Sequence, residues 1–212
     1  MVSRHCMSVF ALLLMFVTTP SYAGGTDASA ELYMKLTRMQ SLSAHFQQIV
    51  NDHEGYVTQD VKGRFHVRQP NKIYWETFAP YEQIVVSNGE KLWIYDSDLE
   101  QVTVQEATDL EGPLALLSES LEALQAKYNI SQSTTGIEKV FQLVPKINDE
   151  SSSFSVVRFS FADEHLKSIS IVDKLRQTTE IRLNELQVNP NTADSTFEFV
   201  VPEGVDIVIN EQ

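Results

Sequence analysis

Cysteine is almost absent from this chain, since its 212 residues include only Cys6. Cys6 precedes the apolar run at residues 9–17, whereas a cysteine that receives a lipid after export would have to follow such a run. A single cysteine forms no internal disulfide, and the chain after the run has neither a thiol nucleophile nor a sulfur ligand for a metal. We therefore expect an exported chain that is neither lipidated nor disulfide-bonded.

Long hydrophobic runs are missing too, because residues 9–17 fall well short of the ~20 apolar residues that a membrane-spanning helix needs. The run follows the basic Arg4 and precedes Ser-Tyr-Ala at 21–23, the small-x-small pattern of a signal-peptidase site. This order predicts a secretory signal peptide at 1–23, with a short membrane anchor as the alternative. Residues 24–212 suffice for one sizeable core, so we expect them to form a single domain.

Basic residues are few compared with acidic ones. The chain has 16 Lys and Arg against 29 Asp and Glu, which gives a formal net charge of −13. An acidic exported protein is poorly suited to binding nucleic acid or anionic lipid headgroups. The balance favours a protein that stays in solution between two membranes.

Catalytic and metal-binding motifs are also missing from the sequence. The histidines after the leader, His45, His53, His66 and His165, have no ligand-like spacing. There is no Gly-x-Ser-x-Gly elbow, no phosphate-binding glycine loop and no dinucleotide fingerprint, and the acidic residues are dispersed. We therefore expect a binding protein that uses no metal and no cofactor, and a hydrolase is the least favoured alternative.

The richest strand pattern in the chain lies at 68–102, where apolar residues recur with a period of two. Pro70 and Pro80 cannot donate to a strand ladder, and Asn88-Gly89 offers the two positive-φ positions of a tight hairpin turn. The pattern predicts four short antiparallel strands at 72–78, 82–87, 91–95 and 99–105.

The segment before this meander predicts one helix and two strands. A helix that Asp27 or Ser29 caps and that ends near Gln40 would place Leu32, Leu36 and Met39 on one face. A strand at 43–50 follows. Residues 61–69 then alternate, with Val61, Gly63, Phe65, Val67 and Gln69 on one face and Lys62, Arg64, His66 and Arg68 on the other.

Two of these patterns admit more than one interpretation. The basic row of Lys62, Arg64 and Arg68 is either a docking face for an acidic partner or an ordinary solvated face. The leucines at 114–117 follow Gly112-Pro113 and have almost no polar face, so the segment is either a core plug or a lid over a ligand. A short helix at 120–127 comes next.

The second half of the chain predicts five more strands, at 128–133, 139–145, 154–161, 166–173 and 176–188. Together with the earlier strands they amount to about 10–11, and an antiparallel sheet of that size curls or closes.

The meander also carries short motifs in a fixed order: Pro70-Asn71, Trp75-Glu76, Pro80, Gln83-Ile84-Val85-Val86-Ser87-Asn88-Gly89, Leu92-Trp93-Ile94-Tyr95 and Gln101-Val102. Their order and spacing resemble the LolA family, periplasmic carriers that move lipoproteins toward the outer membrane of Gram-negative bacteria. The resemblance extends over most of the chain after residue 23, including Phe197-Glu198-Phe199 near its end.

The resemblance implies a mainly β (α+β) fold. The expected architecture is an incompletely closed antiparallel β-barrel with an N-terminal helix and short lid helices over a hydrophobic cavity for acyl chains. By position, the cavity role falls on Phe65, Val67, Ile73, Trp75, Ile84 and Val86 of the strands and on Leu114, Leu116 and Leu117 of the lid. The implied partners are acylated lipoproteins, an inner-membrane ATP-driven release complex and an outer-membrane receptor, and we expect a periplasmic monomer.

One position departs from the family pattern. The family usually has an arginine directly before the turn proline, where it hydrogen-bonds to the lid, and here that residue is Gln69. Either Gln69 holds the lid through neutral hydrogen bonds, which are roughly half as strong as charge-assisted ones, or Arg68 reaches inward through a local bulge at Pro70. The remaining alternatives are a lipid or lipoprotein sensor, the lipid-anchored receptor of the same pathway, and a carrier of another apolar ligand.

Overall fold

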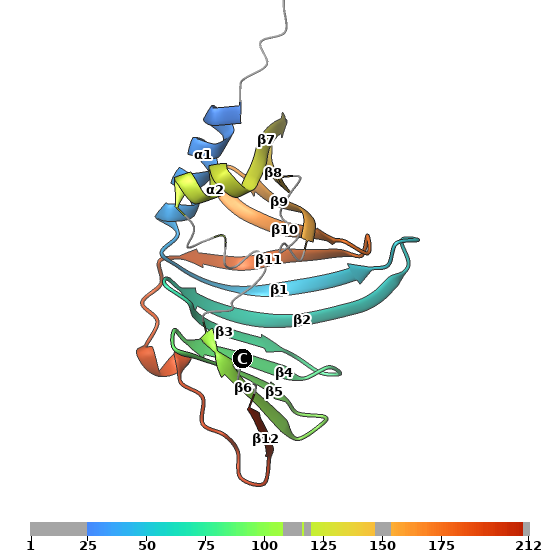
Figure 1. Cartoon of the computed structure of the whole chain (residues 1–212), viewed down its shortest axis with the longest axis vertical. Coiled ribbons are helices and arrows are strands. Elements are labelled where there is room, and N and C mark those ends of the chain that lie inside the picture. Colours follow the sequence, from blue (N-terminus) through green and yellow to red (C-terminus); the bar gives the residue numbers. More distant parts are fainter. Residues whose placement is uncertain (1–24, 108–115, 117–119, 147–153, 210–212) are drawn as a thin grey trace, which may run out of the picture.

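The computed structural model describes residues 25–107, 116, 120–146 and 154–209 (Figure 1). The elements are, in chain order, α1 (Gly25–Arg38), β1 (Ser41–Asn51), β2 (Val57–Arg68), β3 (Lys72–Thr77), β4 (Gln83–Asn88), β5 (Lys91–Asp96), β6 (Gln101–Glu106), α2 (Leu121–Lys127), β7 (Tyr128–Thr135), β8 (Glu138–Pro145), β9 (Phe154–Ala162), β10 (His165–Asp173), β11 (Thr178–Val188), the 3-10 turn η3 (Asp194–Phe197) and β12 (Asp206–Ile209). Among these residues, no helix has the length and apolar character needed to cross a membrane.

All of these strands belong to one curved sheet. Its order is β12-β6-β5-β4-β3-β2-β1-β11-β10-β9-β8-β7, so β12 and β7 are edges and the sheet stays open (Figure 1). Neighbouring strands are antiparallel except β12, which runs parallel to β6. The predicted incompletely closed antiparallel fold is thus confirmed, with one more strand than the sequence pattern predicts because β12 was not recognised.

The two faces of the sheet differ as the alternation in β2 predicts. Phe65 is 3% exposed and Val67 is 7% exposed, whereas Lys62 and Arg64, which alternate with the buried positions of this strand, are exposed. We call the side that carries Phe65 the inner face and the side that carries Arg64 the outer face.

The main core lies on the inner face, beneath the two helices. The α1 residues Ala28, Leu32 and Leu36, and Met39 just after the helix, are buried at spacings of four and three, as the predicted helix requires. They share one cluster with Leu124 of α2 and with side chains of the sheet, among them Phe141, Phe159, Phe161 and Leu166. Each fully buried side chain of this kind contributes about 1.5–3 kcal/mol, so the helices are held mainly by apolar contact.

Two ion pairs also fasten α1 to the strand edge. Lys35 pairs with Glu164 in the turn between β9 and β10, and its ammonium lies 5.1 Å from the centre of the Phe161 ring. One helical turn earlier, Glu31 accepts a hydrogen bond from Lys139 of β8 at 2.6 Å. We call these two pairs the α1 latch.

A glycine in β2 makes room for an aromatic stack on the inner face. Gly63 lies opposite Phe46 of β1, and a Cβ at Gly63 would stand 2.0 Å from the Glu76 carbonyl oxygen and 2.4 Å from the Phe46 ring. The Phe46 ring can therefore lie over β2 and approach Trp75, with ring centres 4.1 Å apart. Phe65 stacks on the same indole at 5.4 Å.

A strap formed by residues 189–199 crosses the outer face. Arg68 donates to the Thr192 carbonyl at 3.2 Å, pairs with the Asp194 carboxylate, and lies 4.9 Å from the centre of the buried Phe197 ring. Further along, the Phe199 ring packs against Trp93 at 6.4 Å. The strap thus covers a second, smaller apolar surface, opposite the main core.

Replacing Gly63 with Ala should cost the folded state about 3 kcal/mol, because the added methyl meets backbone on one side and the Phe46 ring on the other. Denaturant unfolding measures this cost. Gly136→Ala is the control, since nothing lies within 4 Å of its Cβ and only its positive φ is penalised, by about 1 kcal/mol. Equal losses in the two variants would contradict the steric argument.

Candidate functional site

Four of the predicted cavity residues do share the inner face. Phe65 pairs with Trp75, and Val67 pairs with Ile73, across β2 and β3. Directly paired residues of antiparallel strands point to the same side. Phe65, Val67 and Ile73 are buried, and Trp75 is half-buried against the same core cluster.

The prediction that Ile84 and Val86 line the same surface is wrong. In β4 it is Val85 that pairs with Trp75, whereas Ile84 pairs with Glu76 and Val86 with Tyr74. Ile84 and Val86 therefore lie on the outer face and Val85 on the inner one. The run Ile84-Val85-Val86 has no alternation, so its pattern could not choose a face, and a shift of one residue reverses every assignment.

Both Val86 and Ile84 have neighbours on the outer face. Val86 is 1% exposed, and β4 contacts η3 of the strap. Ile84 lines an outer pocket of about 370 Å³, together with Glu76, Phe78 and Tyr95.

Of the predicted lid leucines, only Leu116 belongs to the described part of the chain. It is 2% exposed and belongs to the inner-face core cluster with residues of α1 and α2. Leu114 and Leu117 lie outside the described residues. The sequence-based choice between a core plug and a lid is not decided by this placement, because a closed lid and a plug bury the same side chain.

The two candidates for the lid-coupling position have different surroundings. The Gln69 backbone N–H donates to the Gln40 carbonyl at 2.9 Å, which places Gln69 beside the turn that joins α1 to β1. Arg68 holds the strap on the outer face, so the idea that Arg68 reaches inward at Pro70 is wrong.

The basic row of the outer face is only partly available to a partner. Arg64 donates to Glu76 at 2.5 Å, and this hydrogen bond raises the pKa of the Arg64 guanidinium. Arg68 is engaged by the strap, whose Asp194 carboxyl has its pKa lowered by the hydrogen bond from Arg68. Lys62 is exposed, and none of the described residues forms an ion pair with it.

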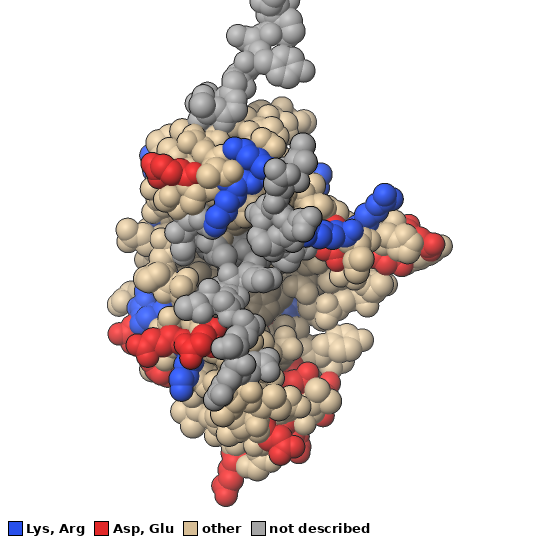
Figure 2. All heavy atoms as spheres, viewed as in Figure 1, with Lys and Arg blue, Asp and Glu red and all other residues tan. Residues whose placement is uncertain are grey.

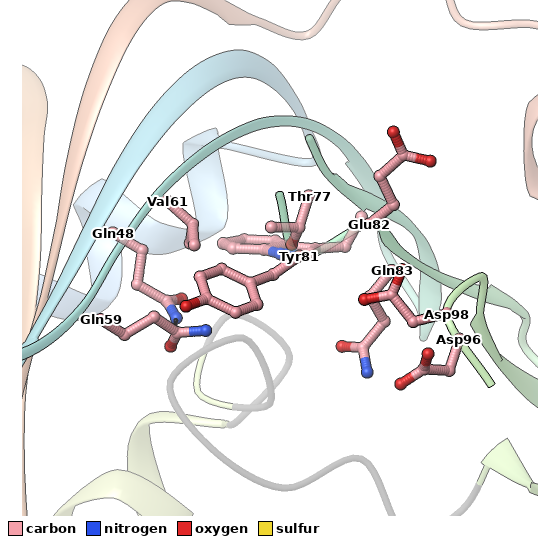
Figure 3. Close-up of a pocket in the computed structure, with 10 residues that line it drawn as sticks. Gln48, Gln59, Val61, Thr77, Tyr81, Glu82, Gln83, Asp96 and Asp98 are labelled. Atoms are coloured by element: carbon pink, nitrogen blue, oxygen red, sulfur yellow. Dashed lines mark hydrogen bonds between the residues drawn. The ribbon is translucent and has the colours of Figure 1, made fainter. Parts of the chain in front are cut away.

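A polar pocket of about 350 Å³ lies at the end of the inner face away from Gln69. It is lined by Gln48, Gln59, Val61, Trp75, Thr77, Tyr81, Glu82, Gln83, Asp96 and Asp98 (Figure 3). Sequence reasoning missed this pocket. Its one signal was Gln48, a polar residue at an inward position of β1 between Phe46 and Val50.

The described residues of the inner face combine apolar and polar side chains. Across 25–107, 116, 120–146 and 154–209, no group of three or more His, Cys, Asp or Glu is placed to hold a metal ion. What the inner face offers instead is a row of apolar and aromatic side chains that ends in a polar pocket. Such a surface suits an amphiphilic ligand.

One solved structure with this fold is an uncharacterised conserved protein from Thermus thermophilus. It superposes with a TM-score of 0.53 at 12% identity, over 86% of this chain and 99% of that one. At that identity the likeness shows the fold alone.

Sequence relatives carry the assignment further. An outer-membrane lipoprotein carrier protein from Chromohalobacter salexigens is 34% identical over 97% of this chain and 96% of its own length. A protein of the same description from Coxiella burnetii is 31% identical over 92% of this chain and 93% of its own. The family model of the outer membrane lipoprotein carrier protein LolA matches residues 37–200, and the chain therefore belongs to that family.

Proposed function

We propose that this protein is a periplasmic carrier that binds the acyl chains of lipoproteins on the inner face of its sheet. The observation that supports this most is an apolar region on the inner face of an open sheet, covered by α1, α2 and Leu116. The proposed ligand-binding residues are Phe65, Val67, Gln69, Ile73, Trp75, Val85 and Leu116. Leu114 and Leu117 remain candidates on the sequence alone.

The energetics explain why such a surface is needed. Exposing an acyl chain of sixteen carbons to water costs on the order of 12 kcal/mol, at ~0.8 kcal/mol for each methylene. A carrier must cover the chain and then release it. Exchanging the leucines of the cover for an acyl chain replaces one apolar contact with another, so loading and release each need only a modest net free energy.

Loading would require the cover to move. The polar pocket of about 350 Å³ is near the lower end of the ~300–1,000 Å³ typical of small-molecule sites. Several acyl chains need far more room, and the space beside Phe65 and Trp75 is taken by the core cluster. We infer that α1, α2 and Leu116 withdraw from the inner face as the chains enter.

The rest of the route follows from this role. Residues 1–23 would direct export to the periplasm, and residues 24–212 would act as one domain without catalysing a reaction. An inner-membrane ATP-driven complex would hand over the cargo, and an outer-membrane receptor that binds it more tightly would take it. A monomer suits both exchanges, and within the predicted basic row Lys62 is the residue left to dock an acidic partner, since Arg64 and Arg68 are engaged.

Native mass spectrometry of the protein purified from periplasm tests the proposal directly. We expect a complex with one triacylated lipoprotein. Recovery of free fatty acid or glycolipid alone would point to a carrier of another apolar ligand, and would overturn the lipoprotein role.

A pair of neighbouring substitutions in β4 tests which face binds the acyl chains. Val85→Asn should weaken binding of a tripalmitoylated peptide about tenfold, because it places an amide against the apolar chain. Ile84→Asn should leave binding nearly unchanged, since Ile84 faces outward. Both side chains are half-buried, so each serves as the stability control for the other. Stronger loss in Ile84→Asn would reverse the face assignment.

The α1 latch should govern how fast cargo enters. Glu164→Gln should speed uptake of a fluorescent fatty acid by up to about fivefold, the range expected for an ion pair whose carboxylate is exposed to solvent. Glu180→Gln is the control, because it removes a pair with Arg182 that lies away from α1. Unchanged uptake in Glu164→Gln, measured by stopped-flow fluorescence, would show that α1 is not the moving part.

The same pair gives a dependence on pH. The hydrogen bond from Lys35 lowers the pKa of the Glu164 carboxyl below its ordinary 4.5. Its stabilising effect is therefore complete above pH 4.5 and is lost as the pH falls through the lowered value. The difference in uptake between wild type and Glu164→Gln should disappear in that acid range, and a difference that persists there would rule out the carboxylate as its cause.

A further inference from the structure

The inner face changes character along the length of its strands. On β1 it runs from Phe46 to Gln48, and on β3 it runs from Ile73 through Trp75 to Thr77. Trp75 belongs to both regions, since it packs against the apolar core cluster and also lines the polar pocket. One continuous surface thus passes from apolar to polar.

The polar pocket has two ends of different chemistry. Figure 3 shows Gln48, Gln59 and Tyr81 together on one side, where the Gln48 amide donates to Gln59 at 3.3 Å. Gln83, Asp96 and Asp98 lie on the other side (Figure 3). One side therefore offers amides and a phenol, and the other is acidic.

The carboxylates of the acidic end keep capacity for a ligand. Asp96 accepts the Leu99 N–H at 3.1 Å, and Glu82 accepts the Ser97 hydroxyl at 3.3 Å. An ionised carboxylate has about four acceptor sites, so these bonds leave most of them open. Among the described residues, no Lys or Arg lines the pocket, and acidic side chains lie at the lowest end of the face shown in Figure 2.

We propose that this pocket holds the polar junction of the cargo, meaning the acylated cysteine and the first residues of its peptide, and that it favours a cationic peptide over an anionic one. The proposal rests on the proposed function and names where the headgroup of that same ligand sits.

An amphiphile binds best where the polarity of the surface matches its own along its length. When acyl chains lie along Phe65 and Trp75, their amide and ester groups reach the polar end. These groups give up hydrogen bonds to water as they are buried, so they need hydrogen-bond partners on the protein. The Gln48 and Gln59 amides and the Tyr81 hydroxyl can both donate and accept. Beyond them, Glu82, Asp96 and Asp98 attract a positively charged peptide and repel a negative one.

The test compares two tripalmitoylated cysteinyl peptides that differ only in a lysine-rich or a glutamate-rich tail. Each competes with a fluorescent fatty acid for the full-length mature protein. We expect the lysine peptide to bind about tenfold more tightly, since several exposed ion pairs each contribute a small amount. This preference should shrink as salt is raised.

A charge-neutralised variant identifies the pocket as the source. Glu82→Gln, Asp96→Asn and Asp98→Asn together should reduce the preference to about twofold. The matched control Glu90→Gln, Glu122→Gln and Glu203→Gln removes the same charge from exposed sites outside the pocket and should keep it. Thermal unfolding of both variants checks that they are folded.

The possible results distinguish a failure of the pocket's role from a failure of the carrier function. Equal binding of both peptides by the wild type, or a preference that survives pocket neutralisation, would overturn the pocket's role and leave the carrier function standing. If neither peptide displaces the fatty acid, the lipoprotein-carrier function itself fails, and the pocket's role fails with it.

Discussion

The structure depends on how the apolar inner face of an open sheet is covered. Apolar surface left in water costs about 25 cal/mol per Å², so the inner face of this sheet cannot stay bare. A closed barrel would hide that face inside itself, but here β12 and β7 remain edges. The cover has to come from elsewhere, and α1, α2 and Leu116 supply it. A cover made of separate pieces is one that a ligand of similar polarity can replace.

The outer face is covered by the strap, which is attached through polar contacts as well as apolar ones. There the strap is fixed by hydrogen bonds and an ion pair from Arg68 and by burial of Phe197. Removing it would expose polar groups as well as rings, so nothing apolar could substitute for it. The cover that we propose to be exchangeable thus lies on the inner face, and the one fixed by polar contacts lies on the outer face.

The sequence was informative wherever polarity alternates and uninformative where it does not. The alternation in β2 predicted the correct face for Phe65 and Val67, and the spacing in α1 predicted its buried stripe. The uniform run Ile84-Val85-Val86 carried no such signal, and only the strand pairing assigned its faces. The fit between Gly63 and Phe46 and the late strand β12 depend on contacts between distant segments, which no local pattern reports.

The connection between α1 and β1 shows which end of the helix is better anchored. Asn189 donates to the Arg38 carbonyl at 2.9 Å and accepts the Ser41 N–H at 3.1 Å, and its own N–H donates to the Ser41 carbonyl at 2.8 Å. These bonds satisfy backbone groups at the end of α1, and water would have to replace all of them if the turn moved. Earlier in the helix, Glu31 and Lys35 form the ion pairs of the latch, and solvent reaches at least one partner of each pair. The hydrogen bonds of Asn189 therefore favour, for the proposed movement of α1, a path that leaves the turn at Arg38 to Ser41 in place.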